Sequence, residues 1–453
     1  MVGGLIGSLL LAAAYFVVDS LASRSDAVTP TREVAGTVHP VLSARRTPAT
    51  LSQVSRLGQL RRGLATATSR LPTGACLRVD WLGETVASVR SAQAFVPASA
   101  SKLLTAAVAL EVLGPDHVFE TAVYADQAAG ATVVPTLYVV GGGDPSIVSQ
   151  DYVAREKYPT RHGTSLESLV DAIVSTGVRQ ITNGISVIDD RYDATRYVDS
   201  WPSSFHGVEA GPLGALMFND ATIIGEEMKG DDPAVSAGID LTTLLGQRGV
   251  SVGVAPRRLD ALPPNAVKVA SVTSAPLSQI VTDMLVNSDN NTAEMLLKEI
   301  GLEKTGLGTT EAGIEAVTST VAAWGLSNAP VVGDGSGLSR VNAFSCDIFV
   351  ELLDRQRDVF PAMLAVAGRT GTLENVLLDT PAEGVMSAKT GTLSGVKSLV
   401  GYQQLENEQD VAFALVMNSA GIDNQSAYRS IWNSLADALG RAKAVPRPEQ
   451  LAP

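Results

Sequence analysis

Residues 97–104 read PASASKLL and open an apolar segment that runs to Leu113, where a Gly-Pro pair stops it. This pattern predicts a helix from about Ser99 to Leu113. Ser99 and Lys102 are three positions apart and would share one face of the helix, so the lysine amine could reach the serine hydroxyl. The free N–H groups at the helix N-terminus favour negative charge near Ser99, and burial would lower the pKa of Lys102 until it could act as a base.

The Ser-x-x-Lys pattern is common, and this chain has a second copy at Ser394 and Lys397. Taken alone, Ser99 would fit the N-cap of the predicted helix equally well. The assignment of chemistry to Ser99 therefore depends on two further motifs downstream.

The second motif is Ser288-Asp289-Asn290, which lies between an apolar segment ending at Asn287 and a further helical pattern. The Ser288 hydroxyl and the Asn290 amide could point into one cavity, where one relays a proton and the other holds a substrate carbonyl. The alternative is a polar connection between helices with a capping serine.

The third motif is Lys389-Thr390-Gly391-Thr392, which we predict to begin a strand that ends near Tyr402. A lysine and hydroxyl groups on an edge strand, with a glycine that lets a ligand approach the backbone, suit the recognition of a carboxylate. The same Lys-Thr-Gly triplet occurs at 304–306, where it ends a helical pattern and its glycine is a ready C-cap. The strand context favours Lys389.

The motifs occur in the order Ser-x-x-Lys, Ser-x-Asn and Lys-Thr-Gly, each on the type of element that its chemistry needs. This combination resembles the penicillin-recognising acyl-serine enzymes. The separation of 189 residues between Ser99 and Ser288 is too long for a compact β-lactamase. It is similar to the class C low-molecular-mass penicillin-binding proteins, the D-alanyl-D-alanine carboxypeptidase/endopeptidase family, which carry an insertion there. Further stretches that resemble this family are 97–115, 141–146, 334–342 and 388–396.

The resemblance implies a role for each motif. Ser99 would be the nucleophile, Lys102 its base and Ser288 a further group in proton transfer. Substrate binding would fall to Asn290, Lys389, Thr390, Gly391, Thr392, Asp144 and Arg340. The Lys-Thr-Gly-Thr motif would hold the terminal carboxylate, and the backbone N–H groups of Ser99 and Thr392 would form the oxyanion hole.

Asp144 and Arg340 carry a separate prediction. In the family that this chain resembles, the aspartate of the GGGDP-type segment and the arginine of DGSGLSR line a pocket for the free end of the diamino-acid side chain. An Asp–Arg pair there could clamp an ammonium and a carboxylate at once. The alternative is a turn aspartate and a surface arginine.

The remaining patterns predict an α+β fold, and the resemblance implies a penicillin-binding or β-lactamase-like transpeptidase domain of sheet and helices with a large strand-rich insertion. Alternation at 76–81 and 84–90 predicts a hairpin, and 396–405 and 411–419 predict strands. We expect a signal or membrane anchor at 1–23, a linker at 24–50, a catalytic domain at 51–125 and 272–445, and one or more inserted accessory domains at 126–271.

Composition and charge exclude several classes of function. Of the 453 residues, 45% are hydrophobic and 18% charged, which fits a globular protein. The net charge of −13, with no basic run, argues against nucleic acid as a partner. The four histidines lack the spacing of metal ligands and the two cysteines cannot form a four-ligand zinc site, so we expect no metal and no cofactor.

Residues 2–18 contain no charged side chain, which predicts either a cleaved signal or a retained membrane anchor. Both place the folded part outside the cytoplasm, in the cell envelope, the periplasm or the medium. An uncleaved segment would make the membrane a partner. In such a compartment Cys76 and Cys346 could form a disulfide or remain two small buried side chains, and the sequence leaves that choice open.

We therefore predict a serine D-alanyl-D-alanine carboxypeptidase, which could also be a DD-endopeptidase. It would act on peptidoglycan stem peptides through an acyl-enzyme, with β-lactams as inhibitors. One alternative is a β-lactamase or esterase of the same fold, but the Glu-x-x-Leu-Asn segment typical of class A β-lactamases is absent between Asn290 and Lys389. The other is a non-catalytic peptidoglycan-binding protein, against which the intact Ser99 and Lys102 argue.

Overall fold

The computed structural model describes residues 47–326, 329–405 and 409–443, with side chains from residue 53 to residue 442. The predicted signal or anchor at 1–23 lies outside the described residues. The end of the predicted linker, by contrast, is helical, because the first described helix, α2, spans Thr47–Thr68. Within the described part of the chain, no helix has both the length and the apolar character that crossing a membrane requires.

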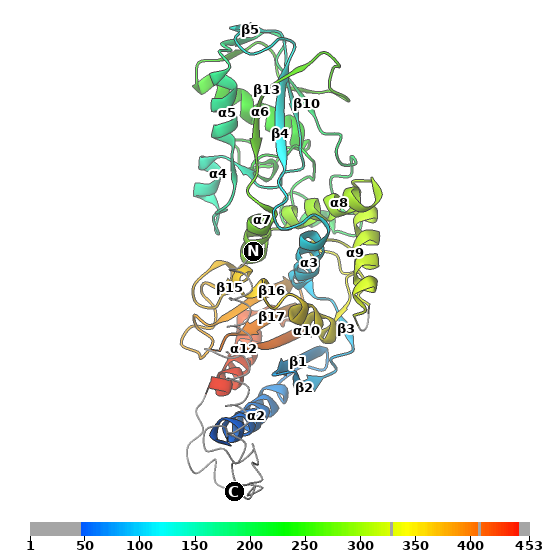
Figure 1. Ribbon diagram of the computed structural model, residues 1–453, viewed down its shortest axis with the longest axis vertical. Coiled ribbons are helices and arrows are strands. Elements are labelled where there is room, and N and C mark those ends of the chain that lie inside the picture. The colour runs from blue at the N-terminus through cyan, green and yellow to red at the C-terminus, as the bar shows by residue number, and fades with distance from the viewer. Residues whose placement is uncertain (1–46, 327–328, 406–408, 444–453) are drawn as a thin grey trace, which may run out of the picture. The chain divides into compact units, whose positions relative to one another are not determined.

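An antiparallel sheet of six strands has the order β15-β16-β17-β18-β1-β2. Its strands are β1 (Ala75–Trp81), β2 (Glu84–Val89), β15 (Ala365–Val366), β16 (Met386–Leu393), β17 (Val396–Gln403) and β18 (Val411–Asn418). Figure 1 shows the N-terminal hairpin of β1 and β2, in blue, beside the orange strands of the C-terminal part. The hairpin and the two late strands are as predicted.

One predicted strand boundary is wrong. We expected a single strand from Lys389 to near Tyr402, but β16 begins three residues earlier and the chain reverses after Leu393 to return as β17. The turn is possible because Gly395 has φ 72°, a conformation that glycine adopts without steric cost. Lys389 therefore lies inside a strand and not at its start.

Helices cover both faces of this sheet, and the alternation of side chains along β18 explains the two apolar layers. Ala412, Ala414 and Val416 belong to one buried cluster, with residues of α3, α7, α8, α9 and α10. Phe413 and Leu415 belong to the other, with residues of α2 and α12. The helix bounds are α3 (Lys102–Val112), α7 (Leu277–Asn287), α8 (Asn290–Thr305), α9 (Thr310–Trp324), α10 (Cys346–Arg355), α11 (Phe360–Met363) and α12 (Gln425–Gly440).

The middle of the chain forms a second, mixed sheet of five strands in the order β12-β10-β6-β4-β13. These strands are β4 (Glu120–Ala125), β6 (Leu137–Val140), β10 (Ile185–Ile188), β12 (Arg257–Arg258) and β13 (Val267–Thr273). Its apolar cluster includes residues of α5 (Leu166–Ser175) and α6 (Pro233–Gln247). The remaining short strands and α-helix are β3 (Ala94–Phe95), β5 (Val133–Val134), β7 (Ile147–Val148), α4 (Gln150–Arg155), β8 (Thr164–Ser165), β9 (Gln180–Ile181), β11 (Ser251–Val252) and β14 (Phe344–Ser345).

The membership of β4 in this second sheet bears on the domain boundaries. β4 lies within the segment 51–125 that we assigned to the catalytic domain, yet it pairs with β6 and β13. We therefore propose that the inserted part begins near Glu120 and ends near Thr273.

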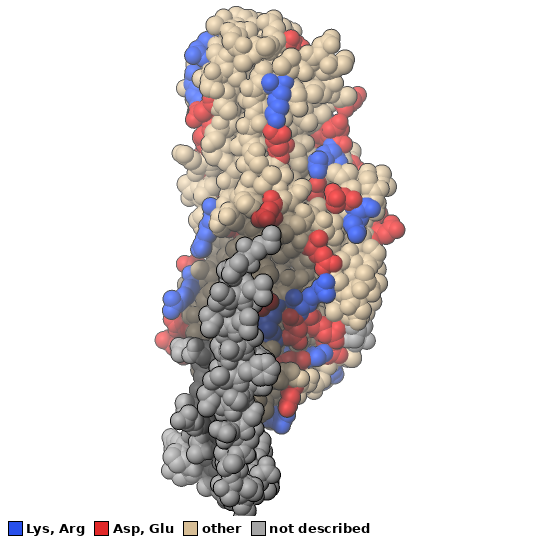
Figure 2. Space-filling model, viewed as in Figure 1, with Lys and Arg blue, Asp and Glu red and all other residues tan. Residues whose placement is uncertain are grey.

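Charged side chains of both signs lie next to one another over the face drawn in Figure 2.

Cys76 and Cys346 form a disulfide, with their Cα atoms 5.9 Å apart, which settles the choice that the sequence left open. Cys76 lies on β1 and Cys346 is the first residue of α10, so the bond joins the sheet to a helix that packs on it. Both cysteines are fully buried. Disulfides of this kind persist in oxidising compartments outside the cytoplasm.

Candidate active site

Ser99 lies in a short 3-10 turn, η2 (Ala98–Ser101), that leads directly into α3. The predicted helix start at Ser99 is therefore three residues too early. Ala98 has φ 49°, an unusual value for a residue with a side chain, and this bend leaves Ser99 partly exposed between two buried neighbours. The N-cap of α3 is Ser101, without a side-chain capping bond, so the structure does not give Ser99 the capping role.

Lys102 is fully buried, and its ammonium contacts acceptors from separate parts of the chain. Nζ lies 3.2 Å from Ser99 Oγ, 2.7 Å from Asn290 Oδ1 and 2.6 Å from the carbonyl oxygen of Ser336. Burial lowers the pKa of Lys102 to about 8, although the carboxylates of Asp334 and other acidic residues nearby oppose the shift.

These contacts suit Lys102 as a general base. The carbonyl oxygen of Ser336 and Oδ1 of Asn290 can each take one N–H of a neutral amine. The lone pair that remains then faces Ser99 Oγ and can accept its proton. A pKa near 8 keeps a usable fraction of the amine neutral at physiological pH.

Ser288 connects α7 to α8 in a left-handed conformation, with φ 66°. Its Oγ accepts a hydrogen bond of 2.8 Å from Nζ of Lys389, which also donates to the carbonyl oxygen of Thr390. Burial and the positive charge of Lys102 lower the pKa of Lys389 well below its usual value. The structure thus joins the second and third motifs directly, and it places the Lys389 nitrogen on Ser288.

The edge of β16 faces the serine turn. β15 pairs only with Ser387 and Ala388 of β16, and η2 packs against the strand beyond them. A side chain at Gly391 would approach within 2.5 Å of the Pro97 carbonyl oxygen. Gly391 therefore lets the strand come close to the Ser99 turn.

A loop that sequence reasoning left without a catalytic role completes the surroundings of Lys102. This loop, residues 334–342, supplies the Ser336 carbonyl oxygen. Glu294, fully buried on α8, accepts hydrogen bonds from the backbone N–H groups of Gly335 and Ser336. Burial and the neighbouring Asp334 raise the pKa of Glu294 to about 8. The only sequence signal for this loop was the DGSGLSRVN stretch, which says nothing of its contact with Lys102.

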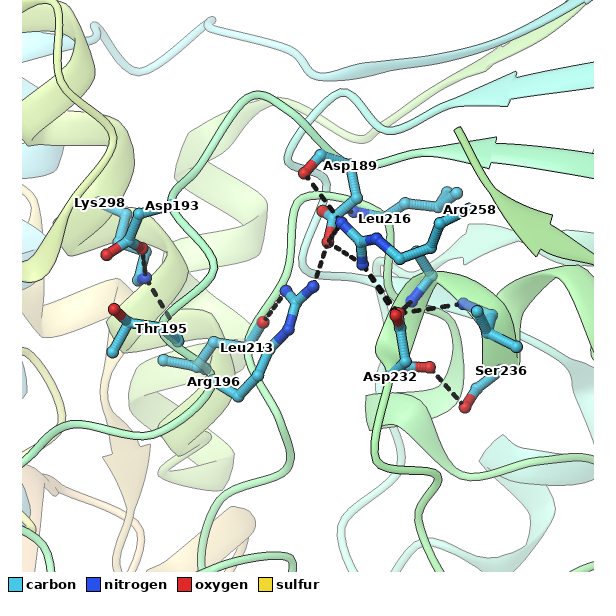
Figure 3. Close-up of polar contacts among 12 residues, drawn as sticks. Asp189, Asp193, Thr195, Arg196, Leu213, Leu216, Asp232, Ser236, Arg258 and Lys298 are labelled. Atoms are coloured by element: carbon cyan, nitrogen blue, oxygen red, sulfur yellow. Dashed lines mark hydrogen bonds and ion pairs between the residues drawn. The ribbon is translucent and has the colours of Figure 1, made fainter. Parts of the chain in front are cut away.

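The segment between β10 and α6 also borders the site, although we had assigned it to the insertion. Asn290 Nδ2 donates a hydrogen bond to the carbonyl oxygen of Glu209. This segment therefore orients the amide whose oxygen accepts a hydrogen bond from Lys102. Nζ of Lys298, on α8, donates hydrogen bonds to Asp193 and to the carbonyl oxygen of Thr195 (Figure 3).

At the start of the same segment, the Asp189 carboxylate forms ion pairs with Arg196 and Arg258 (Figure 3). Arg258 also pairs with Asp232, which caps the start of α6. These contacts lie within the insertion and order it, whereas the Lys298 contacts and the Asn290 contact tie the insertion to α8. No pattern in the sequence pointed to them.

The second Ser-x-x-Lys pair lies in a different setting from the first. Ser394 lies in the turn between β16 and β17 and not at the start of a helix. Nζ of Lys397 donates to Thr392 Oγ1 at 2.8 Å. The choice of Ser99 over Ser394 agrees with this geometry.

Asp144 and Arg340 have different hydrogen-bond partners and different exposure. The Asp144 carboxylate is 1% exposed and accepts hydrogen bonds from Ser146 and from Thr164 Oγ1. Burial raises its pKa. Arg340 is exposed and donates to the carbonyl oxygen of Ser394 at 2.6 Å, beside the turn that ends β16. This geometry favours a turn role for Asp144, and the clamp stays a prediction.

Because a lysine amine lies beside the serine and a sheet edge faces both, the fold and the site together define a penicillin-recognising acyl-serine enzyme. The chain belongs to the D-Ala-D-Ala carboxypeptidase 3 (S13) family, because the sequence pattern of that family matches residues 80–229 and 219–439. The predicted class of enzyme, a serine-type D-Ala-D-Ala carboxypeptidase, is confirmed.

Relatives and solved structures agree with this family. A D-alanyl-D-alanine carboxypeptidase of Actinomadura sp. is 31% identical over 421 residues, covering 74% of this chain and 76% of the relative. Carboxypeptidase DacB of Mycolicibacterium smegmatis is 29% identical, covering 73% of each chain. The crystal structure of penicillin binding protein 4 from Haemophilus influenzae has a TM-score of 0.67 at 19% identity, covering 83% of this chain and 98% of its own. The α+β fold that we predicted is thus confirmed.

Proposed function

We propose that Ser99 is the nucleophile of this carboxypeptidase and Lys102 its base. The observation that carries the proposal is the position of Lys102 Nζ, 3.2 Å from Ser99 Oγ with its other contacts to Asn290 and Ser336. Lys102 takes the Ser99 proton as Oγ bonds to the carbonyl carbon of the penultimate D-alanine. The backbone N–H groups of Ser99 and Thr392 stabilise the oxyanion.

The acyl-enzyme forms when the terminal D-alanine leaves, and it is then hydrolysed by water. The C–N bond to the terminal D-alanine breaks, and its nitrogen accepts the proton through Ser288, whose hydroxyl is oriented by Lys389. Water next attacks the Ser99 ester with Lys102 as its base, which releases the shortened peptide and restores the Ser99 hydroxyl. The hydroxyl groups of Thr390 and Thr392 hold the terminal carboxylate.

The substrate that fits this chemistry is a peptidoglycan stem peptide ending in D-Ala-D-Ala. A β-lactam would acylate Ser99 in the same way, but the opened ring stays attached as part of the acyl group and does not leave. A crystal structure of the Haemophilus influenzae penicillin binding protein 4 is described as complexed with a β-lactam. Cleavage of D-alanyl cross-links, and the choice between a cleaved signal and an anchor at residues 2–18, stay predictions.

A covalent label tests the nucleophile. Ser99→Ala should lose all labelling by a fluorescent penicillin on a denaturing gel, because the acyl bond is made by that oxygen. Ser394→Ala is the matched control, since it alters the serine of the second Ser-x-x-Lys pair, and it should label like the parent protein. Loss of label in Ser394→Ala alone would overturn the assignment. Rapid turnover of the penicillin would favour a β-lactamase. Absence of any label on the parent protein would favour a non-catalytic binding protein.

A further inference from the structure

Lys397 is the lysine of the second Ser-x-x-Lys pair, and the reaction described above gives it no role. It lies on β17 directly opposite Thr392 of β16, so the two side chains share one face of the sheet. Its Nζ donates to Thr392 Oγ1 at 2.8 Å. Thr392 is exposed at the sheet edge, whereas Lys397 is only 8% exposed.

Lys397 packs against aromatic rings and forms no ion pair with a described carboxylate. Its Nζ lies 4.1 Å from the ring centre of Tyr428 and 5.1 Å from that of Trp432, both on α12. Among the ion pairs of the described residues, none includes Lys397. Aromatic faces stabilise a cation without neutralising its charge.

Burying an ammonium group without a carboxylate partner is unfavourable, because the group loses its hydration. An anion bound close to Lys397 would offset this loss. Burial lowers the pKa of Lys397 to about 8 while Asp423 raises it and Arg429 lowers it, so the amine is still mostly protonated at neutral pH. Because Nζ–H fills an acceptor site of Thr392 Oγ1, the hydroxyl proton of Thr392 is free to point away from Lys397, toward an anion at the sheet edge.

We propose that Lys397 is a positioning residue for the substrate carboxylate. Its charge acts through the Thr392 hydroxyl, which it orients and polarises as a donor to the terminal carboxylate of D-alanine. This inference rests on the proposed role of Thr392 in holding that carboxylate. It makes Lys397 a determinant of specificity for substrates that end in a free carboxylate.

The test compares two thioester substrates of the same acyl group, one whose leaving group carries a carboxylate and one in which that carboxylate is a methyl ester. Lys397→Met keeps an apolar chain against Tyr428 and Trp432 but removes the charge. It should lower kcat/KM for the carboxylate substrate by roughly ten- to a hundredfold, mainly through KM, and leave the ester substrate within about twofold. Lys397→Arg should restore part of the preference, because it restores the charge.

Two further arms make the outcomes distinct. Thr392→Val combined with Lys397→Met should cost little more than either change alone, because both act on one contact. Equal losses on the two substrates, or no loss on either, would overturn the proposal. Failure of the parent protein to form a Ser99 acyl-enzyme with the carboxylate substrate would instead count against the proposed function.

Discussion

At the scale of single residues, the protonation state of Lys102 should control the rate of acylation. Its pKa of about 8 means that the neutral amine, the form that can accept the Ser99 proton, increases as the pH rises through 8. The second-order rate of acylation by benzylpenicillin should therefore rise with pH to a plateau with a midpoint near 8. Lys102→Ala should lower that rate by roughly 10²- to 10⁴-fold. A flat pH profile in the parent protein would contradict this assignment.

Arg340 and Asp144, which the sequence paired, should behave differently when changed separately. Arg340 is exposed next to the turn after β16, where it can reach a substrate. Arg340→Ala should lower kcat/KM for a peptide with a free diamino-acid end by roughly ten- to a hundredfold, because a charge-assisted contact is lost. Acylation by benzylpenicillin, which lacks that end, should change little. Equal losses on peptide and penicillin would indicate a general effect on the cavity.

Asp144→Ala should act on stability and not on specificity. The change removes the acceptor for Ser146 and Thr164 in a buried turn and should lower the free energy of unfolding by roughly 1–3 kcal/mol. Thermal unfolding measures this loss, and peptide and penicillin rates in the folded variant should keep their ratio. A selective loss on the peptide with normal stability would restore Asp144 to the predicted clamp.

At the scale of elements, α8 holds the loop at 334–342 whose Ser336 carbonyl oxygen contacts Lys102. Glu294→Gln replaces one acceptor oxygen by a donor opposite a backbone N–H, so it should displace the Ser336 carbonyl oxygen and slow acylation. The Glu294 carboxyl ionises as the pH rises through about 8, and its ionised form raises the pKa of Lys102. Glutamine carries no such charge, so the midpoint of the pH profile should fall.

Glu299→Gln is the matched control for this prediction, because Glu299 is equally buried on α8 but contacts Arg191 and Tyr192 instead of the loop. It should leave the midpoint where it is in the parent protein. An unchanged midpoint in both variants would show that Glu294 supports the fold alone.

At the scale of the whole molecule, the disulfide joins parts of the chain that are 270 residues apart. Replacing both Cys76 and Cys346 by alanine should lower the free energy of unfolding by about 2–4 kcal/mol, because the unfolded chain gains freedom. The cysteines lie on β1 and α10, which carry none of the proposed site residues, so the folded variant should still bind fluorescent penicillin. Denaturant titration with and without a reducing agent checks this. A reductant should weaken the parent protein and leave the variant unchanged.

The sequence determined the class of enzyme and most of the sheet by local means. Ser99 with Lys102, the Ser288 turn and the Lys389 strand are each short patterns whose order along the chain is readable. The strands around 76–90 and 411–418 follow from alternation of apolar residues, since one period of two residues specifies one buried face. The errors lay where turns and pairing decide, as at Ser394, where a tight reversal divides one apolar run into two strands.

Only the tertiary structure decided which groups meet. The Ser336 carbonyl oxygen contacts Lys102 across 234 residues, and the disulfide closes another long separation, and no local pattern encodes such distances. The same holds for Lys397, which in sequence duplicates the catalytic motif and in space supports Thr392. Burial removes water from these groups, so their roles follow from the partners that the fold supplies and not from their residue types.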